Sequence, residues 1–344
     1  MKYYAGLDVS LEESAVCVVD EQGTVVEEAR VESEPEALAA FFRRLGLVPE
    51  RIGLEACSLS AFLHEALRAA GLPALCIETR HAKGVMKTMP VKTDRKDARA
   101  LAQMMRTGWF RVVHVKSADC RALRALLVAR RQVLNKARDM ENGVRAVLRE
   151  AGLKMGKVGR QGFAARARDL AVGNVALEVV VGPLLSIIET MRRELDRLTK
   201  RAFATVRDDP VCRHLMTAQG VGPLTALAFR ATIDDPARFA RSRDVGVYVG
   251  LTPKRYQSGE TDVSGAVSRC GDELLRTALY EAAHTLMTRA QKYSALKSWG
   301  MAVAKRRGLR RACVAVARKL AVILHAMWRD ATAFRWGKEA PAAA

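Results

Sequence analysis

Short apolar runs and amphipathic stretches alternate through the first 115 residues. Runs with strand character cover residues 3–9, 15–20, 24–31, 51–57 and 73–78, and helical periodicity covers 36–46 and 60–71. Both periodic stretches end in glycine, as helix C-caps commonly do. Three strands in succession, followed by strand–helix–strand units, predict a mixed sheet with helices packed on it.

From about residue 119 the pattern changes to long amphipathic helices. Apolar residues recur every three or four positions through 123–148 and again through 184–198. A connection rich in Gly, Lys and Arg, residues 152–168, separates them. The pattern predicts a helical hairpin or coiled coil, whose stripe packs on its own other arm or on a second protomer.

Residues 205–335 form a further unit, predicted to be mainly α-helical. Two helical stretches in 215–229 surround Gly220-Val221-Gly222-Pro223, which resembles a helix-hairpin-helix turn able to hold a DNA phosphate. The alternative is a plain tight turn between two helices. A polar segment rich in Gly and Ser, residues 250–271, is predicted to be a loop.

These patterns divide the chain into four predicted regions. An α/β domain with the element order of an RNase H-like (RuvC-like) fold covers 1–118. A helical hairpin or coiled-coil region covers 119–204, a mainly α C-terminal domain covers 205–335, and a tail covers 336–344.

Charge points to a polyanionic partner. The chain of 344 residues carries 57 Lys and Arg against 37 Asp and Glu, a formal net charge of +20. Residues 1–60 are acidic overall and residues 121–170 strongly basic. This balance favours nucleic acid over a membrane surface. With neither a signal peptide nor a long apolar run, and with seven scattered cysteines, the sequence predicts a cytoplasmic protein of reduced thiols that associates with the bacterial nucleoid.

Four acids stand out by position. Asp8 lies in the first predicted strand, Glu55 ends a later one, and Asp94 and Asp97 open a predicted helix at 93–105. Acids are uncommon inside strands and are rarely buried without a partner or a cation. Each has a structural alternative: Asp94 as the N-cap of its helix, Asp97 as a favourable charge in the first turn, and Asp8 as a turn residue. Together the four predict a carboxylate site for Mg²⁺, with Mn²⁺ as an alternative ion.

The chain resembles a known family in the order of its motifs. GLDVS, IGLEA and KTDRKDARALA are similar to the three acidic blocks of the D-E-D-D insertion-sequence transposases, the IS-one-ten family. LMTAQGVGPLTALAF, RFARSRDVGVYVGLTPKRYQSG and AVSRCGDELLRTALYEAA are similar to its C-terminal domain. The resemblance covers nearly the whole chain.

The resemblance implies a recombinase that moves its own element under the guidance of a structured noncoding bridge RNA, which pairs with the element and target DNA ends. It implies that Asp8, Glu55, Asp94 and Asp97 bind the metal and that Ser258 attacks the phosphate. Ser264 and Ser268 lie in the same segment, and without the resemblance Ser258 would read as a turn residue. It also implies a homo-oligomer, dimer or tetramer, with a site shared between protomers.

Basic and turn residues are predicted to grip nucleic-acid backbone. They are Lys92, Arg95, Lys96, Lys154, Lys157, Arg160, Gly220, Gly222, Lys254 and Arg255. Two other functions compete with the recombinase. One is a structure-selective nuclease resembling Holliday-junction resolvases, with water as nucleophile. The other is a nucleic-acid-binding scaffold in which the acids are structural.

Overall fold

The computed structural model describes residues 1–86 and 93–337, so the predicted contact residue Lys92 lies outside the described residues. The chain divides into two compact units, Met1–Lys116 and Ser117–Ala344. Each unit is described by itself below.

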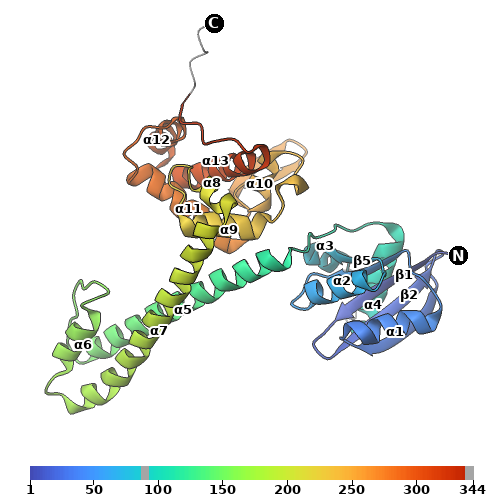
Figure 1. The fold of residues 1–344 in the computed structure, drawn as a ribbon, viewed down its shortest axis with the longest axis horizontal. Coiled ribbons are helices and arrows are strands. Elements are labelled where there is room, and N and C mark those ends of the chain that lie inside the picture. Colours follow the sequence, from blue (N-terminus) through green and yellow to red (C-terminus); the bar gives the residue numbers. More distant parts are fainter. Residues whose placement is uncertain (87–92, 338–344) are drawn as a thin grey trace, which may run out of the picture. The chain divides into compact units, whose positions relative to one another are not determined.

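The first unit is built on a five-stranded mixed sheet (Figure 1). Its strands are β1 (Tyr3–Val9), β2 (Glu13–Asp20), β3 (Val25–Glu32), β4 (Arg51–Glu55) and β5 (Ala74–Ile77). They are ordered β3-β2-β1-β4-β5, with β1 antiparallel to β2 and parallel to β4. Three antiparallel strands continued by two parallel ones confirm the predicted RNase H-like α/β fold.

Helices cover both faces of this sheet. They are α1 (Pro35–Leu45), α2 (Ser60–Ala69), α3 (Thr79–Met86) and α4 (Asp94–Thr107). Leu7 of β1 and Leu54 of β4 are fully buried in one core cluster with residues of α1 and α2. The opposite face carries α4, whose Leu101 and Met105 are fully buried. The alternation of strand side chains therefore assigns each strand residue to one helix layer.

Two glycines let α4 lie directly on the sheet. A Cβ atom at Gly6 would come within 2.2 Å of the carbonyl oxygen of Ala98 and 2.4 Å of the amide nitrogen of Ala102. At Gly53 it would meet the side chain of Met105 at 2.7 Å. The backbone of α4 thus contacts β1 two residues before Asp8, which holds the start of α4 close to the end of that strand.

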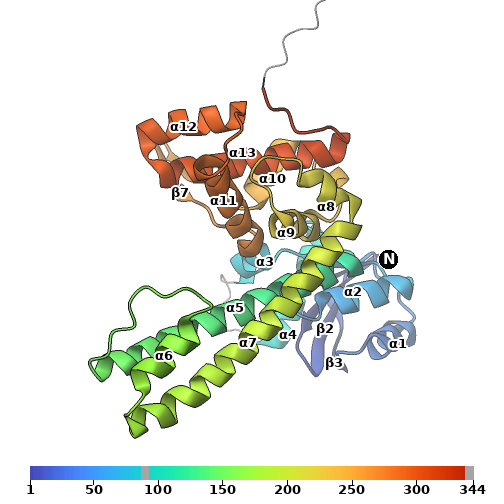
Figure 2. The same cartoon turned by 60° about the vertical axis from the view of Figure 1, so that its left-hand side comes forward.

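The second unit begins with a helical hairpin, in which α5 (Ala118–Glu150) and α7 (Val175–Asp208) lie side by side (Figures 1 and 2). Arg130 bonds Thr199, and Glu141 bonds Arg192 eleven residues further along α5. The two helices run antiparallel, because residues further along α5 bond to residues earlier in α7. The predicted hairpin is present within one chain, and coiled-coil packing stays a prediction.

The connection between these helices, to which the sequence assigned no element, has structure of its own. It contains α6 (Phe163–Ala171), whose Phe163, Ala167 and Ala171 are almost completely buried. These residues recur every four positions, which aligns them on one helix face. They pack into an apolar cluster with α5 and α7.

The rest of the second unit is mainly helical, as predicted. Its helices are α8 (Pro210–Leu215), α9 (Pro223–Ile233), a 3₁₀ turn η1 (Pro236–Arg238), α10 (Ser242–Tyr248), α11 (Glu273–Thr288), α12 (Ala295–Arg307) and α13 (Leu309–Asp330). A large apolar core joins α8, α9, α10, α11 and α13. Across the described ranges, no helix is both long enough and apolar enough to cross a bilayer.

Residues 250–271 were predicted to be a loop, and the structure corrects this. Most of the segment is a hairpin of β6 (Pro253–Ser258) and β7 (Thr261–Val267). Both strands are exposed almost throughout. A strand pair that buries neither face lacks the alternation of apolar and polar residues by which strands are recognised in a sequence.

Candidate active site

An acidic cavity opens at the end of β1. Its lining includes the predicted residues Asp8 and Asp94, together with Glu12, Glu13 and Arg30. The guanidinium of Arg30 lies 3.8 Å from a carboxylate oxygen of Asp94 and 3.8 Å from one of Glu13. Asp8 from the sheet and Asp94 from α4 thus share one cavity, where a cationic group already sits among the carboxylates.

Glu55 belongs to the strand beside Asp8. Leu7 pairs with Leu54 in the parallel β1–β4 register, so Asp8 and Glu55 follow at the carboxyl ends of neighbouring strands. Since Leu7 and Leu54 face α1 and α2, the next residue of each strand faces the α4 layer. The carboxyl edge of a sheet that contains parallel strands is a common place for a ligand site.

The two aspartates of α4 differ sharply in exposure. The side chain of Asp94 is 67% exposed, whereas Asp97 is only 6% exposed. Thr93 caps the helix, because its hydroxyl accepts a 3.3 Å hydrogen bond from the Lys96 amide. The alternative that Asp94 is the N-cap is therefore wrong, and Asp94 is the first helical residue. Asp97 lies one turn later, on the buried side of α4.

The quartet does not form a closed metal-binding group in this structure. Across residues 1–86 and 93–337, no three His, Cys, Asp or Glu side chains are grouped closely enough to hold a metal ion. The exposed carboxylate of Asp94 pairs with Arg30, while Asp97 is directed to the buried side of the helix. The donor chemistry fits Mg²⁺, since all four predicted ligands are carboxylates.

Sequence reasoning missed Glu28, an acid that fastens α4 to the sheet. Its side chain is 11% exposed on β3 and pairs with both Arg95 and Arg99. Burial would raise the pKa of Glu28, but the hydrogen bonds from Arg95 and Arg99 outweigh it and hold that pKa below the ordinary value of 4.5. Arg95, predicted to contact nucleic acid, is therefore already engaged by a carboxylate within the first unit.

Replacing Glu28 with glutamine is expected to lower the free energy of unfolding by about 1–2 kcal/mol at neutral pH, because the charge-assisted hydrogen bonds from two arginines lose their anionic acceptor. A depressed pKa contributes stability above the unfolded pKa, and that contribution is lost as the pH falls through the folded pKa. Wild type and variant should therefore converge in acid. Urea unfolding at several pH values measures this, with Glu27→Gln, on the other face of β3, as control. Equal loss in both variants would contradict the assignment.

Ser258 lies at the tip of the exposed hairpin. It is the last residue of β6 and pairs with Thr261, leaving Gly259 and Glu260 as a two-residue turn. Gly259 has φ 54°, and such two-residue hairpin turns favour glycine where φ is positive. The hydroxyl of Ser258 is thus presented on a short, solvent-exposed turn. Ser264 lies back along β7 opposite Arg255, and Ser268 follows the strand.

Two glycines of the predicted helix-hairpin-helix turn have different surroundings. Gly220 has φ 85°, and a Cβ atom there would lie 2.6 Å from the carbonyl oxygen of Ala282 on α11. Gly222 precedes α9 and is open on this side. Close packing on α11 accounts for Gly220, and a phosphate contact by this turn stays a prediction.

The other predicted contact residues differ in their partners. Arg160 pairs with Asp196 at 3.0 Å, and Arg255 forms a two-pronged pair with Asp262 at 2.8 and 2.6 Å. Lys154, Lys157 and Lys254 are exposed, and Lys96 is half-buried. Contact of these residues with nucleic acid stays a prediction.

Comparisons with known proteins agree on one family. Residues 5–152 match the DEDD model of IS110 transposases, and residues 212–299 match the model described as Transposase IS116/IS110/IS902 family. The transposase for insertion sequence element IS1111A of Coxiella burnetii is 29% identical, over 96% of this chain and 91% of that protein. The transposase for insertion sequence element IS1328 of Yersinia enterocolitica is 26% identical, over 82% of this chain and 85% of that protein.

Among solved structures, Thermus thermophilus RuvC is similar to 32% of this chain over 99% of its own length, with 14% identity and a TM-score of 0.26. The two transposase models match in chain order, the first over the acidic blocks and the second over residues 212–299, which contain α9, α10 and α11. This chain belongs to the IS116/IS110/IS902 family of transposases.

Proposed function

We propose that this transposase cleaves and exchanges DNA strands in a Mg²⁺-dependent reaction guided by a structured noncoding RNA. The observation that carries the proposal is the shared cavity of Asp8 and Asp94, with Glu55 on the adjacent strand and Asp97 one turn further along α4. Membership of a transposase family supports DNA as the substrate. These acids come from three elements fixed on one sheet, which suits a site that must hold a scissile phosphate.

The quartet of Asp8, Glu55, Asp94 and Asp97 would hold the metal. When bound, Mg²⁺ supplies positive charge that stabilises the anionic transition state of phosphoryl transfer. The protein supplies the geometry: Gly6 allows α4 to seat on β1, and Glu28 secures the arginines of the same helix. In the loaded site the Arg30 guanidinium would be free to meet a phosphate oxygen.

Ser258 would be the nucleophile. Its oxygen forms a bond to phosphorus while the bond from phosphorus to the leaving sugar oxygen breaks, and the hydroxyl proton is balanced by the proton that the sugar oxygen gains. The phosphodiester is conserved as a protein–DNA ester, which can be reversed by a new sugar hydroxyl. Ser258 is exposed at the hairpin tip, which suits a hydroxyl that must reach a phosphate of a DNA strand.

RNA guidance is consistent with the charge distribution. Exposed Lys154 and Lys157 adjoin the α5–α7 hairpin, and such cations bind backbone without reading sequence. A protein of this kind can leave target choice to base pairing. The competing function is a structure-selective nuclease that uses water as its nucleophile. Water could also reach the exposed site.

The RNA requirement is tested by reconstitution. The noncoding DNA flanking the gene is transcribed and added to purified protein, element-end DNA, target DNA and Mg²⁺. We expect joined product only in the complete mixture, and a change in the RNA loop that pairs with the target should redirect the product to a matching sequence. A scrambled RNA of the same length is the control. Equal product with scrambled RNA would contradict guidance.

A further inference from the structure

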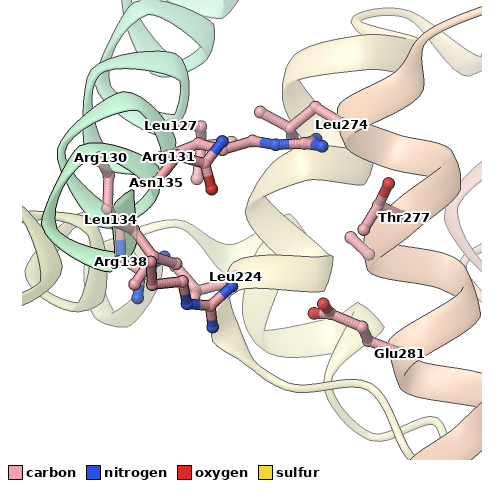
Figure 3. Close-up of a pocket in the computed structure, with 11 residues that line it drawn as sticks. Leu127, Arg130, Arg131, Leu134, Asn135, Arg138, Leu224, Leu274, Thr277 and Glu281 are labelled. Carbon is pink, nitrogen blue, oxygen red and sulfur yellow. The ribbon is translucent and has the colours of Figure 1, made fainter. Parts of the chain in front are cut away.

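A second cavity, outside the acidic site, lies where α5, α9 and α11 meet in the second unit (Figure 3). Its apolar lining includes one half-buried leucine from each helix: Leu134, Leu224 and Leu274. Arg131 and Arg138 of α5 stand on one side, and Glu281 of α11 stands opposite. These three charged side chains come from α5 and α11, and both helices contribute residues to the core of this unit.

The arginines of the cavity are not equivalent. Arg131 pairs with Glu273 at 2.7 Å, and the neighbouring Arg130 donates a 2.8 Å hydrogen bond to Thr199. For Arg138, the described part of the chain offers no ion-pair or hydrogen-bond partner. Its guanidinium points into the space between α5 and α11, next to Leu224 (Figure 3). Arg138, which is exposed, is therefore the arginine of this lining whose whole guanidinium can meet an anionic ligand.

The leucines indicate what else that ligand carries. Leu134, Leu224 and Leu274 are each only half-buried, so the cavity presents apolar surface to its occupant. Contact with that apolar surface would not stabilise the binding of a phosphate alone. A planar base attached to the phosphate would cover the surface and remove it from water, which favours binding. The carboxylate of Glu281, across from Arg138, can accept a hydrogen bond from an exocyclic amino group of such a base.

We propose that this cavity holds one unpaired nucleotide, with its phosphate on Arg138, its base against the three leucines, and Glu281 at the base edge. The assignment rests on the proposed function, because it assumes a protein that handles nucleic acid. A paired base is hidden in its stack, so only a single strand, a loop or an extruded nucleotide can enter. RNA and DNA share this chemistry, and the test separates them.

The test measures fluorescence anisotropy of labelled oligonucleotides with the full-length protein in EDTA, where cleavage is suppressed. Single-stranded RNA, single-stranded DNA and a DNA duplex of about a dozen nucleotides are compared. Arg138→Ala should weaken single-strand binding about tenfold, the effect of losing a charge-assisted hydrogen bond. Duplex binding should change less than about threefold. A loss confined to RNA or to DNA identifies the source of the nucleotide.

Arg149→Ala is the matched control, since Arg149 is an exposed arginine of the same helix that does not line the cavity. Leu134→Asn removes apolar surface without changing charge, and should weaken only the single strands. Equal effects of Arg138→Ala and Arg149→Ala would overturn the site. Equal loss on single strands and duplex would overturn the base-binding part.

The readout separates this inference from the proposed function. Strand cleavage that is insensitive both to Asp97→Asn and to EDTA would refute the metal-dependent reaction while leaving the binding difference between Arg138 and Arg149 intact. If Arg138→Ala binds single strands as tightly as the wild type and still cleaves DNA in Mg²⁺, the nucleotide cavity is refuted and the proposed function is not.

Discussion

Asp97→Asn is expected to reduce the rate of DNA strand cleavage about a thousandfold or more. Without the charge of the metal, the transition state is less stabilised, and the activation free energy rises by several kcal/mol. Asp97 is the most buried member of the quartet, and a buried carboxylate acts in a low dielectric where its charge has a large effect. Asparagine keeps the shape of the side chain, so the variant should fold.

The measurement is cleavage of labelled element-end DNA in Mg²⁺, with DNA binding followed separately. Binding should change less than about threefold, because phosphate contacts spread over the basic surface dominate affinity. Glu36→Gln is the control, since Glu36 lies in the first turn of α1, on the other face of the sheet. EDTA should abolish wild-type cleavage and added Mg²⁺ should restore it. A variant that cleaves at the wild-type rate would show that Asp97 is structural and would remove it from the metal site, whereas a wild-type protein that binds DNA without cleaving it would favour the scaffold function.

Ser258→Ala is expected to remove the covalent protein–DNA adduct completely, because alanine has no oxygen to bond to phosphorus. The side chain is exposed at the hairpin tip and packs on no core, so the loss should leave the free energy of unfolding nearly unchanged. The adduct is trapped on DNA, digested, and its modified residue identified by mass spectrometry.

Ser264→Ala, in the opposite strand of the same hairpin, is the matched control and should still form the adduct. Cleavage by Ser258→Ala at the wild-type rate, without an adduct, would mean that water is the nucleophile. The protein would then act as the structure-selective nuclease considered as the alternative.

Two elements of the second unit were not predicted from the sequence, and for a common reason. The hairpin of β6 and β7 was taken for a loop because both its faces are exposed, so no periodic burial appears in its sequence. No helix was predicted within the connection at 152–168, because its glycines and basic residues obscure the regular spacing of Phe163, Ala167 and Ala171. Periodicity reveals an element only where a continuous stripe of side chains is buried.

The predicted acids show where the limit of such reasoning lies. Asp8 and Glu55 could be placed together from the sequence, because parallel strands bring their carboxyl ends to one edge. Asp97 is buried and Asp94 is exposed because of the way α4 is rotated on the sheet. Close contacts of α4 at Gly6 and Gly53 fix that rotation. The three-residue spacing of Asp94 and Asp97 in the sequence does not determine that rotation.

The sequence by itself determined the mixed sheet, the helical hairpin and the acids at strand and helix ends, because each follows from local periodicity and from the position of a charge within its own element. Only the tertiary structure decided that Glu28 engages Arg95 and that Thr93, not Asp94, caps α4. The tertiary structure also revealed Arg138 beside a leucine-lined cavity. Most of these contacts join residues far apart in the chain, and the packing of whole elements, which no local pattern encodes, brings them together.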